Sequence, residues 1–329
     1  MSKQALRRGL ACVAAFMAMG VHAHPHGEQW GLANEYPASS LPGEGDAHFA
    51  RLVGERAHEK LSIVTLPDAK AGYKSREQLR AVAEGKVAMA DTFGGALGDE
   101  HPIFGLSSLP FVVADFAQAR ALYDAARPAY EAAFARHNQK LLYSTPWPPS
   151  GVWSKVAATT AESVAKLRIR TYDKTATELF ARLGATASVV SFADLPPKLA
   201  SGEIDAVLSS GDGGAGRRLW EHLPHFTEIN YAIPLSFTTV NLDKWNALDA
   251  ETRRAVEGAA AETEARQWKA LEGRLAQNYA RMRENGMTIA TEIAPALRTR
   301  LREAARAAAD DWAAKAGPEG AALLRRESR

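Results

Sequence analysis

A short β-like run in the middle of the chain carries two arginines at alternating positions. It spans residues 167–173, reads LRIRTYD, and stops where a helical pattern begins. A guanidinium at a strand end can bind a carboxylate, because its planar fork of donors matches both carboxylate oxygens and keeps its charge at any accessible pH. A charged residue at a strand end can equally form a salt bridge within the protein. Both interpretations remain open from these residues alone.

A second strand pattern ends in small hydroxyl residues and glycine. Residues 202–211 read GEIDAVLSSG, so Ser209 and Ser210 close an apolar run. In α/β proteins with parallel sheets, ligands bind outside the carboxyl ends of the strands. We therefore expect the ends of this strand and of the arginine-bearing strand to face one cleft.

Short β-rich runs alternate with helical patterns along the chain, which predicts an α/β fold with largely parallel sheets. One helix is expected to begin at Ser75, where Gln78 three residues later suggests a capping box. Residues 249–284 are rich in Ala, Glu, Arg and Gln with almost no helix breakers and predict one long helix in the C-terminal half, and residues 294–315 predict another. The expected strands are 30–35, 61–66, 87–92, 140–144, 152–157, 167–171, 188–191 and 206–209.

Two proline-containing segments divide the pattern where two domains could meet. Residues 147–151, WPPSG, exclude a helix and stiffen the connection, which indicates a hinge, and residues 232–237 offer a return crossing. About 300 residues also exceed one usual hydrophobic core. We predict domain I from residues 24–146 and 236–275, domain II from residues 147–235 and 276–316, and a polar tail over residues 317–329.

The amino terminus has the pattern of a secretory signal peptide. Lys3, Arg7 and Arg8 precede an apolar run over residues 10–19, and small residues lead to a predicted cleavage after Ala23. The run is shorter than the roughly 20 residues of a membrane-spanning helix. Cleavage would remove the only cysteine, Cys12, and three positive charges, so the net charge of +2 would become −1. We expect a soluble periplasmic protein without disulfides and without the basic surface that nucleic acid binding needs.

Four short motifs together resemble one known family, the extracytoplasmic solute-binding proteins (DctP-like) of tripartite ATP-independent periplasmic (TRAP) transporters. They are GKVAMAD at residues 85–91, PIFGL with LPF at residues 102–106 and 109–111, LRIR at residues 167–170, and GEID at residues 202–205. Each motif is weak alone. Their order and spacing over nearly the whole mature chain, together with the long helix, make the resemblance specific.

The resemblance implies a two-domain periplasmic binding protein whose crossing strands and long helix let it close over an organic acid in a central cleft. It also implies delivery of that acid to a permease made of a small and a large integral membrane subunit. In the family, the arginine that matches Arg170 pairs with the carboxylate of the ligand. Arg168, two residues earlier on the same strand, is expected to be structural.

Departures from the family pattern bear on the ligand. Many members have a second arginine one strand earlier, where residues 151–155 here read GVWSK and place Trp153 near that position. Members also often have an asparagine after the glycine–acid motif, where this chain has Ser209 and Ser210. The site would thus have one positive partner fewer and one flat apolar ring more than many members have. This difference favours a monocarboxylate with an apolar or aromatic body, or a 2-oxo or 2-hydroxy acid, over a sialic acid or a sugar acid. Trp153 could instead pack beneath the cleft.

Further candidates for the ligand site lie at strand ends or near the crossings. Glu35 is the least expected of them, because a carboxylate facing an anionic ligand repels it unless it contacts a hydroxyl or another pocket residue. The remaining candidates are Tyr36, Thr92, Phe93, Trp147, Tyr172, Asp173, Asp212, Phe237 and Asn241.

An enzyme is the alternative from a different class. Gly211–Gly216 fits the dinucleotide pattern GxGxxG between a strand and a helical run, as in an NAD(P)-dependent oxidoreductase. No acid follows at the spacing that binds a ribose. The resemblance instead explains the glycines as a tight, close-packed turn at the cleft. We therefore expect no catalytic residues and no cofactor.

Two groups of residues have the composition of a metal site. Glu221, His222, His225 and Glu228 are close in sequence, but Pro224 breaks the register that would bring two ligands to one helix face, so a solvated loop is expected. His24 and His26 flank Pro25, which lacks the amide proton that an amino-terminal copper or nickel clamp would lose. We therefore predict no metal site.

Overall fold

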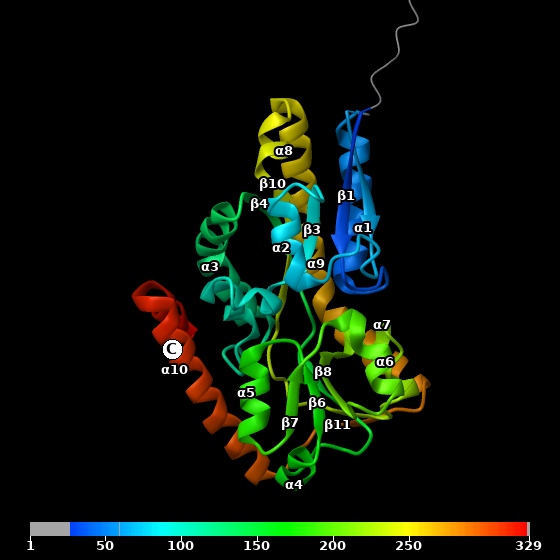
Figure 1. Ribbon diagram of the computed structural model, residues 1–329, viewed down its shortest axis with the longest axis vertical. Helices are drawn as coiled ribbons and strands as arrows, with labels where there is room; N and C mark the ends of the chain where they lie inside the picture. The colour runs from blue at the N-terminus through cyan, green and yellow to red at the C-terminus, as the bar shows by residue number, and fades with distance from the viewer. Residues whose placement is uncertain (1–26, 59, 328–329) are drawn as a thin grey trace, which may run out of the picture.

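The computed structural model describes residues 27–58 and 60–327, and the chain forms two α/β domains one above the other along its long axis (Figure 1). The predicted signal peptide over residues 1–23, with Cys12 and its cleavage point, lies outside the described residues, as do His24 and His26. Within the described part, no helix is both long enough and apolar enough to span a bilayer.

The first domain is built on a sheet with the strand order β2-β1-β3-β10-β4. The helices α1, α2 and α3 pack on its strands, and α8 follows β10. The elements are β1 (Glu28–Asn34), α1 (Leu41–Arg56), β2 (Leu61–Leu66), α2 (Ser75–Ala83), β3 (Met89–Phe93), the 3-10 helices η1 (Gly94–Leu97) and η2 (Pro102–Ser108), α3 (Phe116–Arg136), β4 (Gln139–Pro146), β10 (Leu235–Asn241) and α8 (Leu242–Ala247).

The second domain is built on a sheet with the order β11-β9-β5-β8-β6-β7. Its large apolar cluster is centred on Trp153, Phe180 and Phe226. The elements are β5 (Ser150–Ser154), α4 (Ala161–Ala165), β6 (Arg168–Thr171), α5 (Lys174–Arg182), β7 (Thr186–Val189), η3 (Phe192–Asp194), α6 (Leu195–Ala200), β8 (Ala206–Ser210), α7 (Gly211–Gly216), η4 (Leu219–Glu221), β9 (His225–Thr227) and β11 (Thr288–Ala290).

The sheets are mixed, although the sequence pattern predicts largely parallel ones. β1 is parallel to β2 and β3, and β6 is parallel to β7 and β8, as expected for strands joined through helices. β5 and β10 are antiparallel to their neighbours. These are the strands through which the chain enters each domain from the other, so they run against the strands already there.

Two irregular segments join the domains and pair with one another. Residues 147–149 lead from β4 to β5, and residues 228–234 lead from β9 back to β10. The Trp147 amide donates to the Pro234 carbonyl at 2.8 Å, and the Ser150 amide donates to the Ala232 carbonyl at 2.9 Å. Because both crossings are held together by backbone hydrogen bonds, they can act as one hinge.

Two long helices also connect the domains. α9 (Ala250–Glu284) contacts α1 and β4 in the first domain and α7 and β11 in the second. α10 (Pro295–Glu327) packs on α4 and α5 and then reaches α3 and η2 (Figure 1). The sequence predicts a polar tail from Gly317. The chain instead breaks at Gly317, whose φ of 75° suits glycine, and resumes a helix to Glu327.

The capping of α2 differs from the prediction. Lys74, not Ser75, is the N-cap, and its amide donates to Glu77 Oε2 at 2.9 Å. The Ser75 amide donates to the Glu35 carboxylate, 2.8 Å away, so a residue distant in sequence satisfies this helix end. The local motif therefore predicts the start of the helix to within one residue. The amide of Ser75 is satisfied by a tertiary contact and not by the predicted capping box.

A pair of buried carboxyl groups lies in the first domain between α1 and the sheet. Asp46 accepts hydrogen bonds from Asn34 Nδ2 at 2.7 Å and from the Tyr143 hydroxyl at 3.0 Å, and Asp91 accepts from Thr238 Oγ1 at 3.2 Å. Burial raises the pKa of Asp91 to about 6, and burial and the neighbouring Asp91 charge raise the pKa of Asp46 well above its usual range. The two carboxyl groups therefore share a proton near neutral pH.

Candidate functional site

A small cavity lies between the two domains, at the strand ends where the sequence predicts a cleft. Its volume is about 20 Å³, and a second cavity of about 10 Å³ adjoins it beside Glu35 and Phe192. Tyr36, Phe93, Arg170 and Tyr172 line both. The larger of the two is lined in addition by Trp147, Ser150, Ser209, Ser210 and Pro234.

Arg170 supplies the positive charge of this cavity. The side chain is 2% exposed, and it donates from Nε to the Val190 carbonyl at 2.7 Å and from Nη1 to the Leu208 carbonyl at 3.0 Å. These bonds hold the guanidinium in place and leave further N–H donors on Nη1 and Nη2. Arg170 forms no salt bridge with any residue over 27–58 and 60–327. A fixed, buried guanidinium of this kind can receive a carboxylate in bidentate geometry.

Aromatic rings form the walls around the guanidinium. Its Cζ lies 6.0 Å from the ring centre of Tyr172 and 5.8 Å from that of Phe192. The Tyr36 ring lies 4.6 Å from both Trp147 and Phe192, centre to centre. These rings come from both domains, so closing the cleft buries apolar surface and strengthens every polar interaction inside it.

The hydroxyl groups and the indole provide the remaining polar contacts. The Tyr172 hydroxyl donates to Ser150 Oγ at 3.4 Å, a long bond that a ligand could replace. Trp147 Nε1 donates to Ser236 Oγ at 3.1 Å, and Ser236 in turn hydrogen-bonds to Asp91 of the buried carboxyl pair. The orientation of the Trp147 ring is thus fixed from the core of the first domain.

Burial dominates the electrostatics of the site. It lowers the pKa of Arg170, which the nearby Tyr36 and Glu35 oppose, and it raises the pKa of Tyr36 above its ordinary value. Tyr36 therefore stays neutral, and the Arg170 guanidinium is the positive group that lines both cavities, while Glu35 lines only the smaller one.

The volume of the cavities sets a condition on binding. A single water needs roughly 10 to 15 Å³ of such space, so the closed site has room for about one or two waters. A ligand with several heavy atoms therefore requires the domains to separate or the aromatic side chains to move before it enters. The paired crossings at residues 147–149 and 228–234 are where such a rotation can occur.

Eight of the residues predicted from the sequence lie on these cavities. They come from the ends of β1, β3, β4, β6 and β8 or from the residues that follow these strands, in agreement with the expected cleft. They are Glu35, Tyr36, Phe93, Trp147, Arg170, Tyr172, Ser209 and Ser210.

Three predicted residues lie away from the cavities. Trp153 is fully buried in the second domain, where Nε1 donates to the Ser210 carbonyl, and the packed tryptophan weighed from the sequence matches this position. Phe237 packs in the first domain against the helix α3. Asn241 caps α8 and binds the Val82 carbonyl. The side chains of Trp153 and Phe237 point into the cores of their domains, and Asn241 lies at the end of β10 that is farther from the domain crossings.

Asp212 lies between the domains but not on the cavities. Its Oδ2 accepts the Leu41 amide at 2.7 Å, and its Oδ1 accepts from Arg274 Nε and Asn278 Nδ2. Arg274 continues to Glu44 at 2.9 Å. Asp212 therefore joins α7 of the second domain to the start of α1 in the first.

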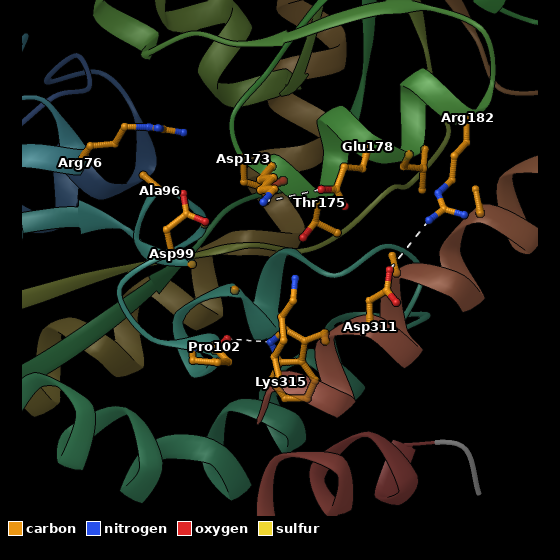
Figure 2. A pocket seen from close by; sticks show the side chains of 18 residues that line it. Arg76, Ala96, Asp99, Pro102, Asp173, Thr175, Glu178, Arg182, Asp311 and Lys315 are labelled. Carbon is orange, nitrogen blue, oxygen red and sulfur yellow. Dashed lines mark hydrogen bonds and ion pairs between the residues drawn. The ribbon is translucent and has the colours of Figure 1, made fainter. Parts of the chain in front are cut away.

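Asp173 lines a separate cavity of about 80 Å³ among η1, α5 and α10 (Figure 2). Arg76 and Asp99 stand on one side and Arg182 and Asp311 on the other, so opposite charges balance. Asp173 caps α5 through the Ala176 amide, and burial raises its pKa to about 7. The balanced charge gives this cavity less preference for an anion than the cavity at Arg170 has, although it is larger.

Several lining residues were not among the predicted site residues. Ser150 adjoins the predicted hinge residues, so a strand-end signal existed for it. Tyr36 was expected from its place after the first strand and lines both cavities, whereas Thr92, expected from the end of the third strand, lines neither. Phe192 and Val190 lie on a short segment after an edge strand, where no pattern in the sequence marked them. Over residues 27–58 and 60–327, no group of three or more potential metal ligands is close enough to hold an ion.

The fold defines a two-domain solute-binding protein with small cavities at the domain interface. The sequence matches the family described as bacterial extracellular solute-binding protein, family 7 (DctP), over residues 32–316. The chain therefore belongs to this family, whose members are the solute receptors of TRAP transporters. The resemblance noted in the four motifs is confirmed.

Solved structures with the same fold support this membership. DctP7 from Bordetella pertussis, an extracytoplasmic solute receptor binding pyroglutamic acid, is 27% identical with a TM-score of 0.88, covering 92% of this chain and 100% of that chain. DctP6 from the same organism, also binding pyroglutamic acid, is 29% identical with a TM-score of 0.87, covering 92% and 99%. A marine metagenome TRAP protein with co-purified pyroglutamate gives the same values as DctP6. No curated protein matched.

Proposed function

We propose that this protein captures a small organic monocarboxylate by domain closure, with pyroglutamate as the first candidate. The observation that carries the proposal is Arg170, a buried guanidinium held at the domain interface without a carboxylate partner among the described residues. An isolated buried charge is unfavourable, and a ligand carboxylate would compensate it. Arg170 is the residue to which the family resemblance assigns this contact.

The other walls support a compact ligand with a single charge. The aromatic rings and Pro234 suit an apolar body, and Ser150, Ser209 and Ser210 can exchange hydrogen bonds with one or two polar groups. Pyroglutamate combines one carboxylate with a five-membered lactam, and it is the ligand named for three relatives at 27–29% identity. Aromatic, 2-oxo and 2-hydroxy acids satisfy the same description and belong in the test.

The delivery step follows from the family. A TRAP receptor passes its ligand to a permease with a small and a large integral membrane subunit, and we propose the periplasm as the location, reached through the signal peptide predicted to end at Ala23. Genes for both permease subunits beside the gene for this protein would support this. Their absence from the whole genome would contradict it.

Binding without turnover distinguishes this function from the oxidoreductase considered from the sequence. Gly214 lies against Trp153, and a Cβ there would be 2.1 Å from Trp153 Cζ2, so close packing alone requires this glycine. Gly213, one of the three glycines of the GxGxxG pattern, is also closely packed, because a Cβ there would lie 2.7 Å from Ser209 Oγ. Close packing therefore accounts for glycines in this turn without a bound nucleotide.

A thermal-shift panel tests the proposal. It contains pyroglutamate, aromatic, 2-oxo, 2-hydroxy and sugar acids, and nicotinamide cofactors. A ligand of the native state raises the melting temperature by mass action. We expect a shift with one class of monocarboxylate, recovered chemically unchanged. A shift with nicotinamide cofactors alone would contradict the proposal.

A further inference from the structure

Glu35 joins the two domains through a single buried carboxylate. The residue is 2% exposed and directly follows β1. Its Oε2 accepts the Ser75 amide at the start of α2, 2.8 Å away, and its Oε1 accepts the Ala193 amide in η3, 2.9 Å away. Ser75 belongs to the first domain and Ala193 to the second. In this conformation, the Glu35 carboxylate therefore bridges the two domains.

The same short segment that binds Glu35 also binds Arg170. We call residues 190–193 the closing segment. At one end its Val190 carbonyl accepts Arg170 Nε at 2.7 Å, and at the other its Ala193 amide donates to Glu35. Between them, the Phe192 ring lies 5.8 Å from the Arg170 Cζ and stacks on Tyr36. The guanidinium and the Glu35 carboxylate therefore hold two ends of one four-residue segment.

We propose that Glu35 is a positioning residue that couples occupation of Arg170 to closure of the cleft, a role that rests on the proposed function. A ligand carboxylate bound to the guanidinium stabilises the hydrogen bond that Arg170 makes to the closing segment, and this segment presents the Ala193 amide to Glu35. The hydrogen bond from Ala193 exists only in the closed state, so it adds to the difference in free energy between the closed and open states. Glu35 acts in this way without contacting the ligand.

A simple charge effect predicts the opposite sign. Glu35 is close enough to Arg170 to influence its pKa, so its negative charge also lies near the expected ligand carboxylate. If repulsion were the main effect, neutralising Glu35 would tighten binding. If the coupling dominates, neutralising it weakens binding, because an amide has one acceptor oxygen and turns its NH₂ toward one of the two N–H donors.

The variants are Glu35→Gln and a matched control, Asp68→Asn. Asp68 also crosses the domain interface, through an ion pair with Arg217 at 3.3 Å, but it is 39% exposed. Asn also tolerates its left-handed backbone, with φ at 56°. Exposed ion pairs contribute little. Affinity is measured by calorimetry with pyroglutamate or the acid that gives the largest thermal shift.

Closure is measured as the distance between two spin labels, one on each domain, by pulsed electron–electron double resonance. Lys70→Cys and Lys166→Cys place the labels at exposed sites of the first and second domains. The only native cysteine is Cys12, in the predicted signal peptide. Both distances, without and with ligand, are recorded for the wild type and for each variant.

We expect Glu35→Gln to weaken binding about 10- to 100-fold and to reduce the closed fraction at a given ligand concentration. Asp68→Asn should stay within about threefold of the wild type. Unchanged or tighter binding by Glu35→Gln, or an unchanged closed fraction, would overturn the coupling.

Failure of the proposed function gives a different result. In that case no acid in the panel binds the wild type. The distances between the labels in the ligand-free protein then test the role of Glu35. Glu35→Gln must still lower the population with the short distance and raise the population with the long one. Identical ligand-free distributions in that case would overturn both ideas.

Discussion

Replacing Arg170 by Met removes the charge of the site while keeping an unbranched side chain in the same space. Removing one partner of a buried charged pair costs about 3 to 5 kcal/mol. At about 1.4 kcal/mol for each tenfold change, this corresponds to binding weakened between about 100-fold and several thousand-fold. The ligand-free protein also loses two hydrogen bonds to carbonyls, but it no longer buries an uncompensated cation. Its melting temperature should therefore change by only a few degrees.

The thermal shift makes this loss measurable. At a ligand concentration of 100 times the wild-type Kd, binding adds about 2.7 kcal/mol of stability. For a chain of this length, that raises the melting temperature by about 4 to 5 °C. At the same concentration, Arg170→Met should gain at most about 0.4 kcal/mol, a shift below about 1 °C.

Arg168→Met is the matched control on the same strand. Arg168 is exposed, lies two residues before Arg170 on β6, and pairs with Asp205 at 2.9 Å, away from the cavities that Arg170 lines. Its ligand-induced shift should equal that of the wild type. A wild-type shift in Arg170→Met, or equal losses in both variants, would refute the assignment of Arg170 to the ligand.

Three further predictions follow from other parts of the molecule. Trp147→Phe keeps a ring at the cavity but loses the indole hydrogen bond, and it should weaken binding about 2- to 10-fold by calorimetry; unchanged affinity would contradict the importance of ring orientation. Gly214→Ala places a Cβ 2.1 Å from Trp153 and should lower stability by about 1 to 3 kcal/mol in urea unfolding; a wild-type midpoint would contradict the close packing. The pKa of Asp91 is raised from 3.8 to about 6, so the native state binds its proton more tightly than the unfolded state, and stability should fall as pH rises through this window. Asp91→Asn should flatten that fall, and an unchanged profile would argue against the shared proton.

Much of the fold follows from sequence patterns, because strand and helix periodicity is local. The strands over residues 61–66, 168–171 and 206–210 and the long helix over residues 250–284 lie within a few residues of the prediction. β10 and β11 are not among the expected strands. β11 has only three residues, and β10 begins inside the segment that was expected only as a return crossing. The antiparallel direction of β5 and β10 depends on where the chain crosses between domains, which periodicity does not encode.

The sequence predicts those site residues whose position follows from the end of a strand. It does not predict those whose place in the site depends on the direction of the side chain. Arg170 and Tyr172 follow from the position of β6 and the family motif. Trp153 and Phe237 lie on suitable strands but point into the cores of their domains. Phe192 reaches the cavity from a short 3-10 segment that no periodicity marks. The partners of Glu35 are backbone amides, which a pattern of side chains does not reveal.

A crystal structure of the protein with the acid that gives the largest thermal shift tests the central claim most directly. We predict a closed cleft in which the ligand carboxylate lies within hydrogen-bond distance of the Arg170 guanidinium, among Tyr36, Trp147 and Tyr172. A ligand bound elsewhere, such as in the charged cavity beside Asp173, would contradict the account.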